Sequence, residues 1–270
     1  MLRSELIQVS IYAIIIDREH GTCLSRPPTP PSLFHSFIGY VSDSETHQSL
    51  SKIAQADCSP IVRVRGPCLD LINRALSTGC YGFLVPMINT AKEARNVVSF
   101  SKFPPQVIRD QGSAFSCFEF PGCETPQEYV KVANENIVVM VQTESFMGVE
   151  NVEETCQVDG IEVIFNDLAL DLLGHTPAKY TESQFLGAID KIVETCRKFE
   201  KKVGILVANG EEARKAVGRF DFVAIGTDPR ALQACYRQKV RSAKGGQDQV
   251  ACFADVTGFN YRQGPGMDVW

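Results

Sequence analysis

The feature that most constrains the fold is a regular alternation, from residue 60 onward, of short apolar runs with longer segments of helical period. The runs are rich in Val and Ile and almost continuously apolar, which is typical of parallel strands covered on both faces. The predicted strands are 61–64, 81–87, 136–144, 161–166, 202–208 and 222–226, and the predicted helices are 69–79, 90–103, 148–158, 182–202, 209–220 and 228–240.

Repeated strand–helix units build either an open doubly wound sheet or a closed barrel. No Gly-x-Gly-x-x-Gly phrase follows the first strand, which weakens the dinucleotide-binding form of the open sheet. The polar residues gather where strands end, namely Arg63, Gln142, Glu144, Asn166 and Asp167. Because the chemistry of a barrel lies at its strand ends, we expect an α/β fold of the TIM (β/α)8 type.

The first sixty residues are less regular. YAIIID (12–17) predicts one more strand and 44–57 a helix, so the count reaches seven strands where a closed barrel needs eight. The missing strand should precede 12–17, where only eleven residues are available, so either residues 1–10 supply an irregular strand or the barrel is incomplete at its first strand. We expect one barrel domain over 1–244, an irregular Pro-rich insertion at 22–40 and a poorly ordered tail at 245–270.

Composition excludes several classes of function. The formal net charge of −5 gives no basic surface for nucleic acid or anionic lipid, and no apolar run is long enough to span a membrane. The N-terminal apolar run ends in charged residues, unlike a signal peptide, which predicts a cytoplasmic protein. The ten cysteines form no Cys-x-x-Cys pair, and we expect reduced thiols in the core rather than disulfides or zinc.

Two carboxylates follow consecutive predicted strands, Glu144 and Asp167. Adjacent parallel strands lie about 5 Å apart, so carboxylates at their carboxyl ends are able to converge on one hard cation such as Mg²⁺ or Mn²⁺. The alternative is that each carboxylate caps the helix that follows it.

Arg63 and His20 are the other candidates for chemistry. If Arg63 points into the barrel, its guanidinium needs an anion, either a substrate carboxylate or, in a structural ion pair, Glu144 or Asp17. His20 follows the strand 12–17 at the mouth of the barrel, where an imidazole is suited to general acid–base catalysis. The alternative for His20 is a capping or surface role.

These residues lie in phrases that resemble the HpcH/HpaI-type metal-dependent 2-oxo-acid aldolase/citrate lyase family, which includes macrophomate synthase. The resemblance runs from about residue 11 to 240. It rests on IIIDREHG (14–21), PIVRVRG (60–66), the block 82–106, RDQGSAF (109–115), VVMVQTES (138–145), NDLALDLLG (166–174) and VAIGTD (223–228).

The resemblance implies an aldolase or lyase that breaks or forms a carbon–carbon bond next to a 2-oxo acid, such as pyruvate or oxaloacetate, with an aldehyde-type partner. It implies a divalent cation on Glu144 and Asp167 that chelates the 2-oxo acid and stabilises its enolate. Arg63 would bind the keto oxygen, Gln142 would position the substrate, and His20, oriented by Asp17, would act as acid and base. The family also implies a homo-oligomer, a hexamer or trimer, with its last helix exchanged between subunits.

The chain departs from the family pattern at several places. The first strand is not evident, the Pro-rich insertion follows His20 directly, the usual Gly-Pro before Asp167 is replaced, and the segment from Glu144 to Asp167 is shortened. Ser77 and Asp110 stand where the family usually has Asp and Gly. Two alternatives therefore stay open: a catalytically impaired paralogue that serves as an oligomerisation partner, and a decarboxylating biosynthetic enzyme like macrophomate synthase.

Overall fold

We describe the fold from a computed structural model of the chain. The described residues are 13–17, 36–38, 41–56, 58–105, 108–111, 113, 115–118, 120–165, 168–175 and 181–244.

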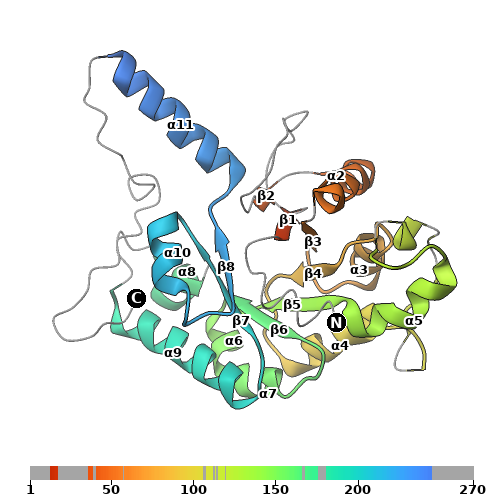
Figure 1. The fold of residues 1–270 in the computed structure, drawn as a ribbon. Coiled ribbons are helices and arrows are strands. Elements are labelled where there is room, and N and C mark those ends of the chain that lie inside the picture. The colour runs from red at the N-terminus through yellow and green to blue at the C-terminus, as the bar shows by residue number, and fades with distance from the viewer. Residues whose placement is uncertain are drawn as a thin grey trace.

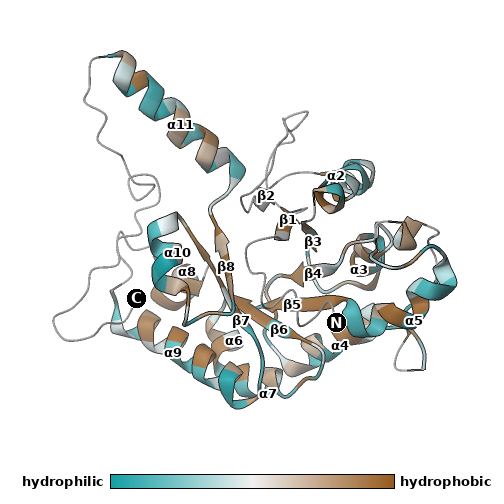
Figure 2. Ribbon diagram, viewed as in Figure 1, coloured by the Kyte–Doolittle hydropathy of each residue, from teal (hydrophilic) through white to brown (hydrophobic). Residues whose placement is uncertain are grey.

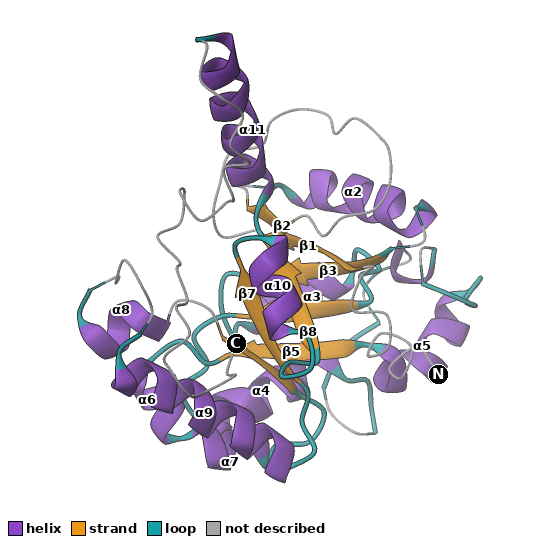
Figure 3. Ribbon diagram, turned by 60° about the vertical axis from the view of Figure 1, so that its left-hand side comes forward, coloured by secondary structure: helices purple, strands orange, loops and turns teal. Residues whose placement is uncertain are grey.

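Eight parallel strands form one sheet in the order β2-β1-β3-β4-β5-β6-β7-β8. Figures 1 and 3 show this sheet curled, with helices along its outer side. From β3 onward the spatial order is the order of the chain, as in a TIM-type barrel. Within the described residues no pairing joins β8 to β2, so the barrel is incomplete along that edge. The strands are β1 (Ala13–Asp17), β2 (Ser36–Ile38), β3 (Ser59–Arg63), β4 (Gly82–Val85), β5 (Val138–Gln142), β6 (Glu162–Phe165), β7 (Val203–Val207) and β8 (Phe222–Ile225).

The helices follow the strands and cover the sheet. Neighbouring helices pack in chain order along the outer layer, α3 on α4, α4 on α7, and α7 on α9. Figure 2 shows brown, apolar strands beside helices that carry teal, polar residues toward the outside. The helices are α2 (Asp43–Gln55), α3 (Leu69–Leu76), α4 (Ala91–Ser101), η1 (Phe115–Cys117), α5 (Pro126–Asn136), α6 (Phe146–Glu150), α7 (Val152–Cys156), α8 (Leu168–Leu173), α9 (Ser183–Lys198), α10 (Gly210–Ala216) and α11 (Asp228–Ala243).

The two faces of the sheet bury separate apolar clusters. The larger cluster fills the space between the strands and the outer helices and includes Val62, Phe83 and Val141. A smaller cluster lies on the opposite face, inside the curl, and consists of Ile61, Leu84, Val138, Met140 and Ile164, with Ile15 packed against it. Because side chains alternate along a strand, this inner face continues to the last residues of β1, β3 and β5.

The structure confirms the α/β barrel type and the seven predicted strands, and it corrects two expectations. The segment 22–40, expected to be irregular, contains the short strand β2 (Ser36–Ile38), which pairs with β1. The additional strand beside β1 therefore comes from after β1 in the chain, while residues 1–11, where we placed it, lie outside the described residues. The helix predicted at 148–158 is two short helices, α6 and α7. The tail 245–270 also lies outside the described residues.

Candidate active site

Three polar side chains stand at the carboxyl ends of strands on the inner face of the sheet. Asp17, Arg63 and Gln142 are the last residues of β1, β3 and β5. Each lies two residues after a member of the inner cluster (Ile15, Ile61 and Met140, respectively), and period-two alternation puts both residues of such a pair on the same face. Asp17 is level with Arg63 in the pairing of β1 with β3. The alternation with Ile61 thus puts Arg63 on the inner face, which is the condition under which its guanidinium needs an anion.

The side chains are joined by a line of hydrogen bonds. Arg63 Nε donates to Gln142 Oε1 at 2.7 Å, and Gln142 Nε2 donates to Glu144 Oε1 at 2.7 Å. On the other side, Arg63 Nη1 lies 3.2 Å from Asp17 Oδ1 and 3.3 Å from Oδ2. The ion pair with Asp17, which the sequence left open as an alternative for Arg63, is therefore present.

All four side chains are buried. The exposed fraction is 9% for Arg63 and 4% for each of Asp17, Gln142 and Glu144. The four side chains include two carboxyl groups and one guanidinium, and electrostatic interactions at such depth are stronger than in water. A carboxylate that is buried and hydrogen-bonded at a strand end is shielded from solvent, so it is placed to contact a bound cation or substrate.

The backbone that carries Glu144 is held by the loop that follows β4. Ile88 N donates to the carbonyl oxygen of Gln142 at 2.9 Å. The Ser145 hydroxyl donates to Asn89 Oδ1, and Asn151 Nδ2 donates to the Asn89 carbonyl oxygen at 2.9 Å. Ser145 also caps α6 by accepting from Gly148 N at 3.0 Å. The position of Glu144 thus depends on β4 and α6 as well as on its own strand.

Sequence reasoning did not identify Asn89, Ser145 and Asn151 as supports of the site. The available signal was the phrase Asn89-Thr90-x-x-Glu93, in which Thr90 and Glu93 form a capping box at the start of α4. That motif fixes where α4 begins, and Glu93 Oε2 also accepts from Asn89 N at 2.9 Å. The contact of Asn89 with Ser145 joins residues far apart in the chain, and no local pattern encodes it.

A further buried carboxylate lies just after β7. Glu212 is 8% exposed, and it accepts hydrogen bonds from Ala208 N at 2.9 Å and from Asn209 Nδ2 at 3.1 Å. Burial raises the pKa of Glu212, and these hydrogen bonds partly oppose the shift. Because both donors, Ala208 and the N-cap residue Asn209, directly precede α10, Glu212 is the carboxylate of a helix cap.

Two of the predicted site residues, His20 and Asp167, lie outside the described residues. Within the described part of the chain, no group of three or more His, Cys, Asp or Glu side chains is placed to hold a metal. Glu144 comes two residues after the end of β5, and Asp167 is two residues after β6 in the sequence. β5 and β6 are paired neighbours, with Gln142 opposite Ile164, and because Asp167 itself lies outside the described residues the convergence of the two carboxylates stays a prediction.

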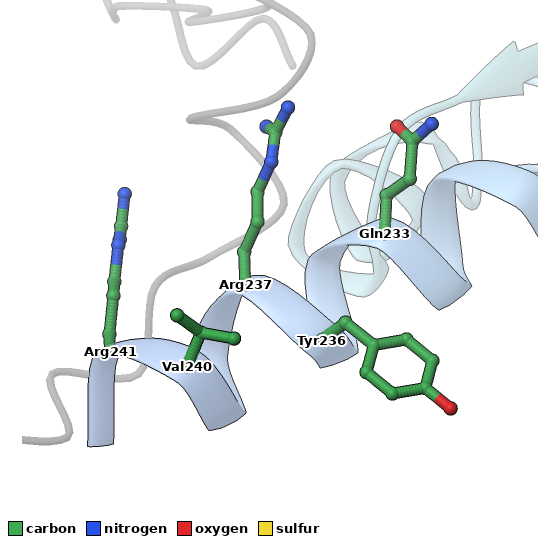
Figure 4. A pocket seen from close by; sticks show the side chains of 5 residues that line it. All are labelled: Gln233, Tyr236, Arg237, Val240 and Arg241. Carbon is green, nitrogen blue, oxygen red and sulfur yellow. The ribbon is translucent and has the colours of Figure 1, made fainter. Parts of the chain in front are cut away.

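A shallow pocket of the structure is found elsewhere, on α11. Among the described residues it is lined by Gln233, Tyr236, Arg237, Val240 and Arg241, all from that helix (Figure 4). It includes none of the strand-end residues. In the part of the chain that the structure describes, no helix has the length and apolar character needed to cross a bilayer.

The sequence is similar to a known family over most of its length. Residues 41–234 match the family model described as HpcH/HpaI aldolase/citrate lyase. A hydroxypyruvate/pyruvate aldolase of Cupriavidus necator is 31% identical over 77% of this chain and 80% of the relative. A hydroxypyruvate/pyruvate aldolase of Rhizorhabdus wittichii is 32% identical over 72% of this chain and 77% of the relative.

Solved structures show the same fold. The HpcH/HpaI aldolase of Desulfitobacterium hafniense superposes with a TM-score of 0.71 over 90% of this chain and 97% of the other, at 21% identity. Macrophomate synthase superposes with a TM-score of 0.66 over 89% of this chain and 80% of the other, at 20% identity. At this level of identity the likeness concerns the barrel architecture.

Proposed function

The chain belongs to the HpcH/HpaI aldolase/citrate lyase family, and from that premise we propose that it is a divalent-metal-dependent aldolase. It breaks or forms a carbon–carbon bond next to the keto group of a 2-oxo acid. Relatives of this chain are named hydroxypyruvate/pyruvate aldolase and 5-keto-4-deoxy-D-glucarate aldolase. We therefore propose pyruvate or hydroxypyruvate as the 2-oxo acid and an aldehyde as its partner.

The observation that carries this proposal is the buried line Asp17–Arg63–Gln142–Glu144 at the carboxyl ends of β1, β3 and β5. An aldol reaction next to a keto group develops negative charge on the keto oxygen. A site for it needs a fixed cationic donor, and Arg63 is held by partners on two sides. It also needs a carboxylate for the cation, and Glu144 is buried and hydrogen-bonded beside it.

The residues present fit a magnesium or manganese ion. Glu144 offers carboxylate oxygens, which hard divalent cations prefer, and the amide of Gln142 orients the carboxylate in the way that outer-sphere partners orient metal ligands. We propose that Glu144 and Asp167 hold the ion, which when bound supplies a Lewis acid that polarises the 2-oxo acid.

The remaining steps belong to side chains of this chain. The guanidinium of Arg63 binds the keto oxygen and stabilises the negative charge that forms there when the carbon–carbon bond breaks. Gln142 keeps the Arg63 Nε–H and the Glu144 carboxylate in fixed positions and contacts the substrate. In the cleavage direction His20 accepts the proton of the aldol hydroxyl group, and in the synthetic direction it returns that proton. Asp17 accepts hydrogen bonds from Arg63 and so orients its guanidinium. In this proposal Asp17 also orients the imidazole of His20.

We propose that the enzyme is a cytoplasmic homo-oligomer, a hexamer or trimer. The support for assembly is α11, which projects away from the barrel and has no buried side chain among its described residues (Figure 1). Leu232, Tyr236 and Val240 are 49%, 60% and 50% exposed, and their i, i+4 and i+8 spacing aligns them along one face. A helix with an exposed apolar stripe calls for a partner surface.

The test replaces the carboxylate of Glu144 by an amide. In Glu144→Gln the side chain keeps its size and loses its charge, so we expect Mn²⁺ affinity to fall by at least roughly tenfold. Pyruvate release from the aldol substrate should fall with it. Glu135→Gln is the matched control, because Glu135 is exposed on α5. Isothermal titration with Mn²⁺ and a coupled pyruvate assay give the two readouts.

Unchanged metal binding and activity in Glu144→Gln would contradict the proposed role of Glu144. A folded wild-type protein that binds no divalent ion and releases no pyruvate from aldol substrates or oxaloacetate would instead favour the impaired paralogue. Product analysis with oxaloacetate and an unsaturated acceptor separates an aldolase from a biosynthetic decarboxylating enzyme.

A further inference from the structure

A pair of buried cysteines faces each other on the outer helix layer, away from the proposed active site. We propose that Cys156 and Cys196 are a redox modification site, a dithiol that a peroxide converts to a reversible disulfide. The bond stabilises the β6–β7 side of the barrel without changing the chemistry at the strand ends. This inference does not depend on the proposed aldolase function.

The sulfur atoms of the pair are in van der Waals contact. The two Sγ atoms lie 3.8 Å apart, and both side chains are 0% exposed. Cys156 is the last residue of α7 and Cys196 lies in the last turn of α9, two helices that pack on each other. A disulfide has an S–S distance of about 2.05 Å, so the sulfur atoms need to move roughly 1.8 Å closer. The proposal requires that this approach come from rotation of the two side chains or from a shift at the end of the five-residue helix α7.

The location of the pair predicts what its oxidation does. Cys156 precedes β6, which begins at Glu162, and Cys196 precedes β7, which begins at Val203. Both thiols therefore lie toward the amino ends of their strands. Arg63, Gln142 and Glu144 are at the carboxyl ends of theirs. In barrels the amino-terminal face contributes to stability and the carboxyl-terminal face to catalysis, so the disulfide should act on stability.

The surroundings of the two thiols give them different pKa values, and the thiol with the lower pKa reacts first. The contact with the Cys196 thiol and the positive charge of Lys201 lower the pKa of Cys156, against the opposing effects of burial and of Glu162. The hydrogen bond to Cys156 and burial raise the pKa of Cys196. The thiolate form, which is the nucleophile, therefore belongs to Cys156. Cys196 is the resolving thiol.

The reaction balances with one molecule of peroxide. The Cys156 thiolate attacks one peroxide oxygen, the O–O bond breaks, and Cys156 becomes a sulfenic acid while hydroxide takes a proton to leave as water. Cys196 then attacks the sulfenic sulfur, the S–O bond breaks, and a second water leaves as the disulfide forms. Two thiols are oxidised and the two peroxide oxygens are reduced. Because both thiols are buried, the peroxide reaches them only when the end of α7 opens, and the reaction should be slow.

The new bond closes a loop of 40 residues that contains β6, α8 and most of α9. A cross-link of this kind restricts the unfolded chain more than the folded one. For a barrel of this size the thermal midpoint should rise by on the order of 5 °C or more. Reduction with dithiothreitol should return it to the starting value.

The experiment treats the full-length protein with hydrogen peroxide and maps disulfides by mass spectrometry of non-reduced peptides. We expect a Cys156–Cys196 cross-link, a higher thermal midpoint, and Mn²⁺ affinity within about twofold of the reduced protein. Cys156→Ala and Cys196→Ala should each abolish both the cross-link and the rise. Cys80→Ala is the matched control, since Cys80 is equally buried but its thiol donates to the Ala75 carbonyl. It should keep the rise.

Two results would overturn the proposal. One is a folded protein in which exposed Cys68 and Cys235 are fully oxidised while Cys156 and Cys196 stay reduced after prolonged exposure. The other is a Cys156–Cys196 cross-link that lowers the thermal midpoint. Should an alanine variant fail to fold, the wild-type peptide map and its reversal by dithiothreitol still decide the question.

Discussion

At the residue scale, the amide of Gln142 sets the arrangement of the site. Its oxygen accepts from Arg63 Nε while its nitrogen donates to Glu144, so only one orientation of the amide satisfies both neighbours. A carboxylate in its place would meet Glu144 with like charge. The residue between a cation and an anion must therefore be a neutral group with one acceptor and one donor, and Gln142 meets this condition.

The first prediction concerns Arg63. Lysine keeps the charge but loses the planar fork, and it cannot donate to Gln142 and Asp17 in the observed geometry. We expect Arg63→Lys to lower kcat/KM for the aldol substrate by on the order of a hundredfold with the fold intact. Steady-state kinetics and circular dichroism measure the two effects. Arg95→Lys, an exposed change on α4, should leave kinetics unchanged, and an active Arg63→Lys enzyme would refute the role.

The sequence was sufficient to predict that the described members of this cluster lie at strand ends, where barrels place their chemistry, while their catalytic roles stay predictions. What it could not predict is the order of contacts. Arg63 pairs with Asp17 rather than with Glu144 because Asp17 is directly opposite it in the β1–β3 register, whereas Gln142 separates it from Glu144. The partners of Arg63 depend on strand register between residues 46 positions apart for Asp17 and 79 positions apart for Gln142. Hydrophobic periodicity within one strand does not encode that register.

At the element scale, the predicted strands and the longer helices agree with the structure to within a few residues, while short or irregular elements were missed. β2 has three residues and follows a Pro-rich segment, so it has no alternation to detect. α8 has six residues and begins just after the predicted strand 161–166, so it is too short for a helical period to be detected. α5 was also missed, although Thr125-Pro-Gln-Glu128 is a capping box with Pro at the first helical position. That local signal should have been enough.

Two glycines give a matched prediction about strand and helix packing. A Cβ at Gly82 in β4 would lie 2.8 Å from the Val138 carbonyl oxygen and 2.9 Å from Ile61 Cδ1, and the backbone atom has no room to move. We expect Gly82→Ala to destabilise the protein by about 1–3 kcal/mol. Gly187 in α9 has open space around its Cα, so Gly187→Ala should stabilise by about 0.5–1 kcal/mol. Urea unfolding midpoints that shift the same way in both variants would contradict this account.

At the scale of the whole molecule, the proposed roles are distributed over three regions. The carboxyl ends of the strands carry the buried polar cluster, and the helix layer near the amino ends of β6 and β7 carries the cysteine pair. The helix α11 contacts the edge strand β2 and projects away from the barrel (Figure 3). Since no side chain described in α11 is buried, a stable position for this helix needs a surface outside the described barrel.

The last prediction tests that surface. The stripe of Leu232, Tyr236 and Val240 is apolar and half exposed, and a charge placed on it would be buried in any complex that covers the stripe. We expect Tyr236→Glu with Val240→Glu to weaken assembly by at least roughly tenfold and to shift the mass measured by light scattering toward the monomer. Gln238→Glu, two residues from Tyr236 and on the opposite face of the helix, adds the same charge and should leave the mass unchanged. An assembly that survives the double change would show that α11 does not hold the subunits together.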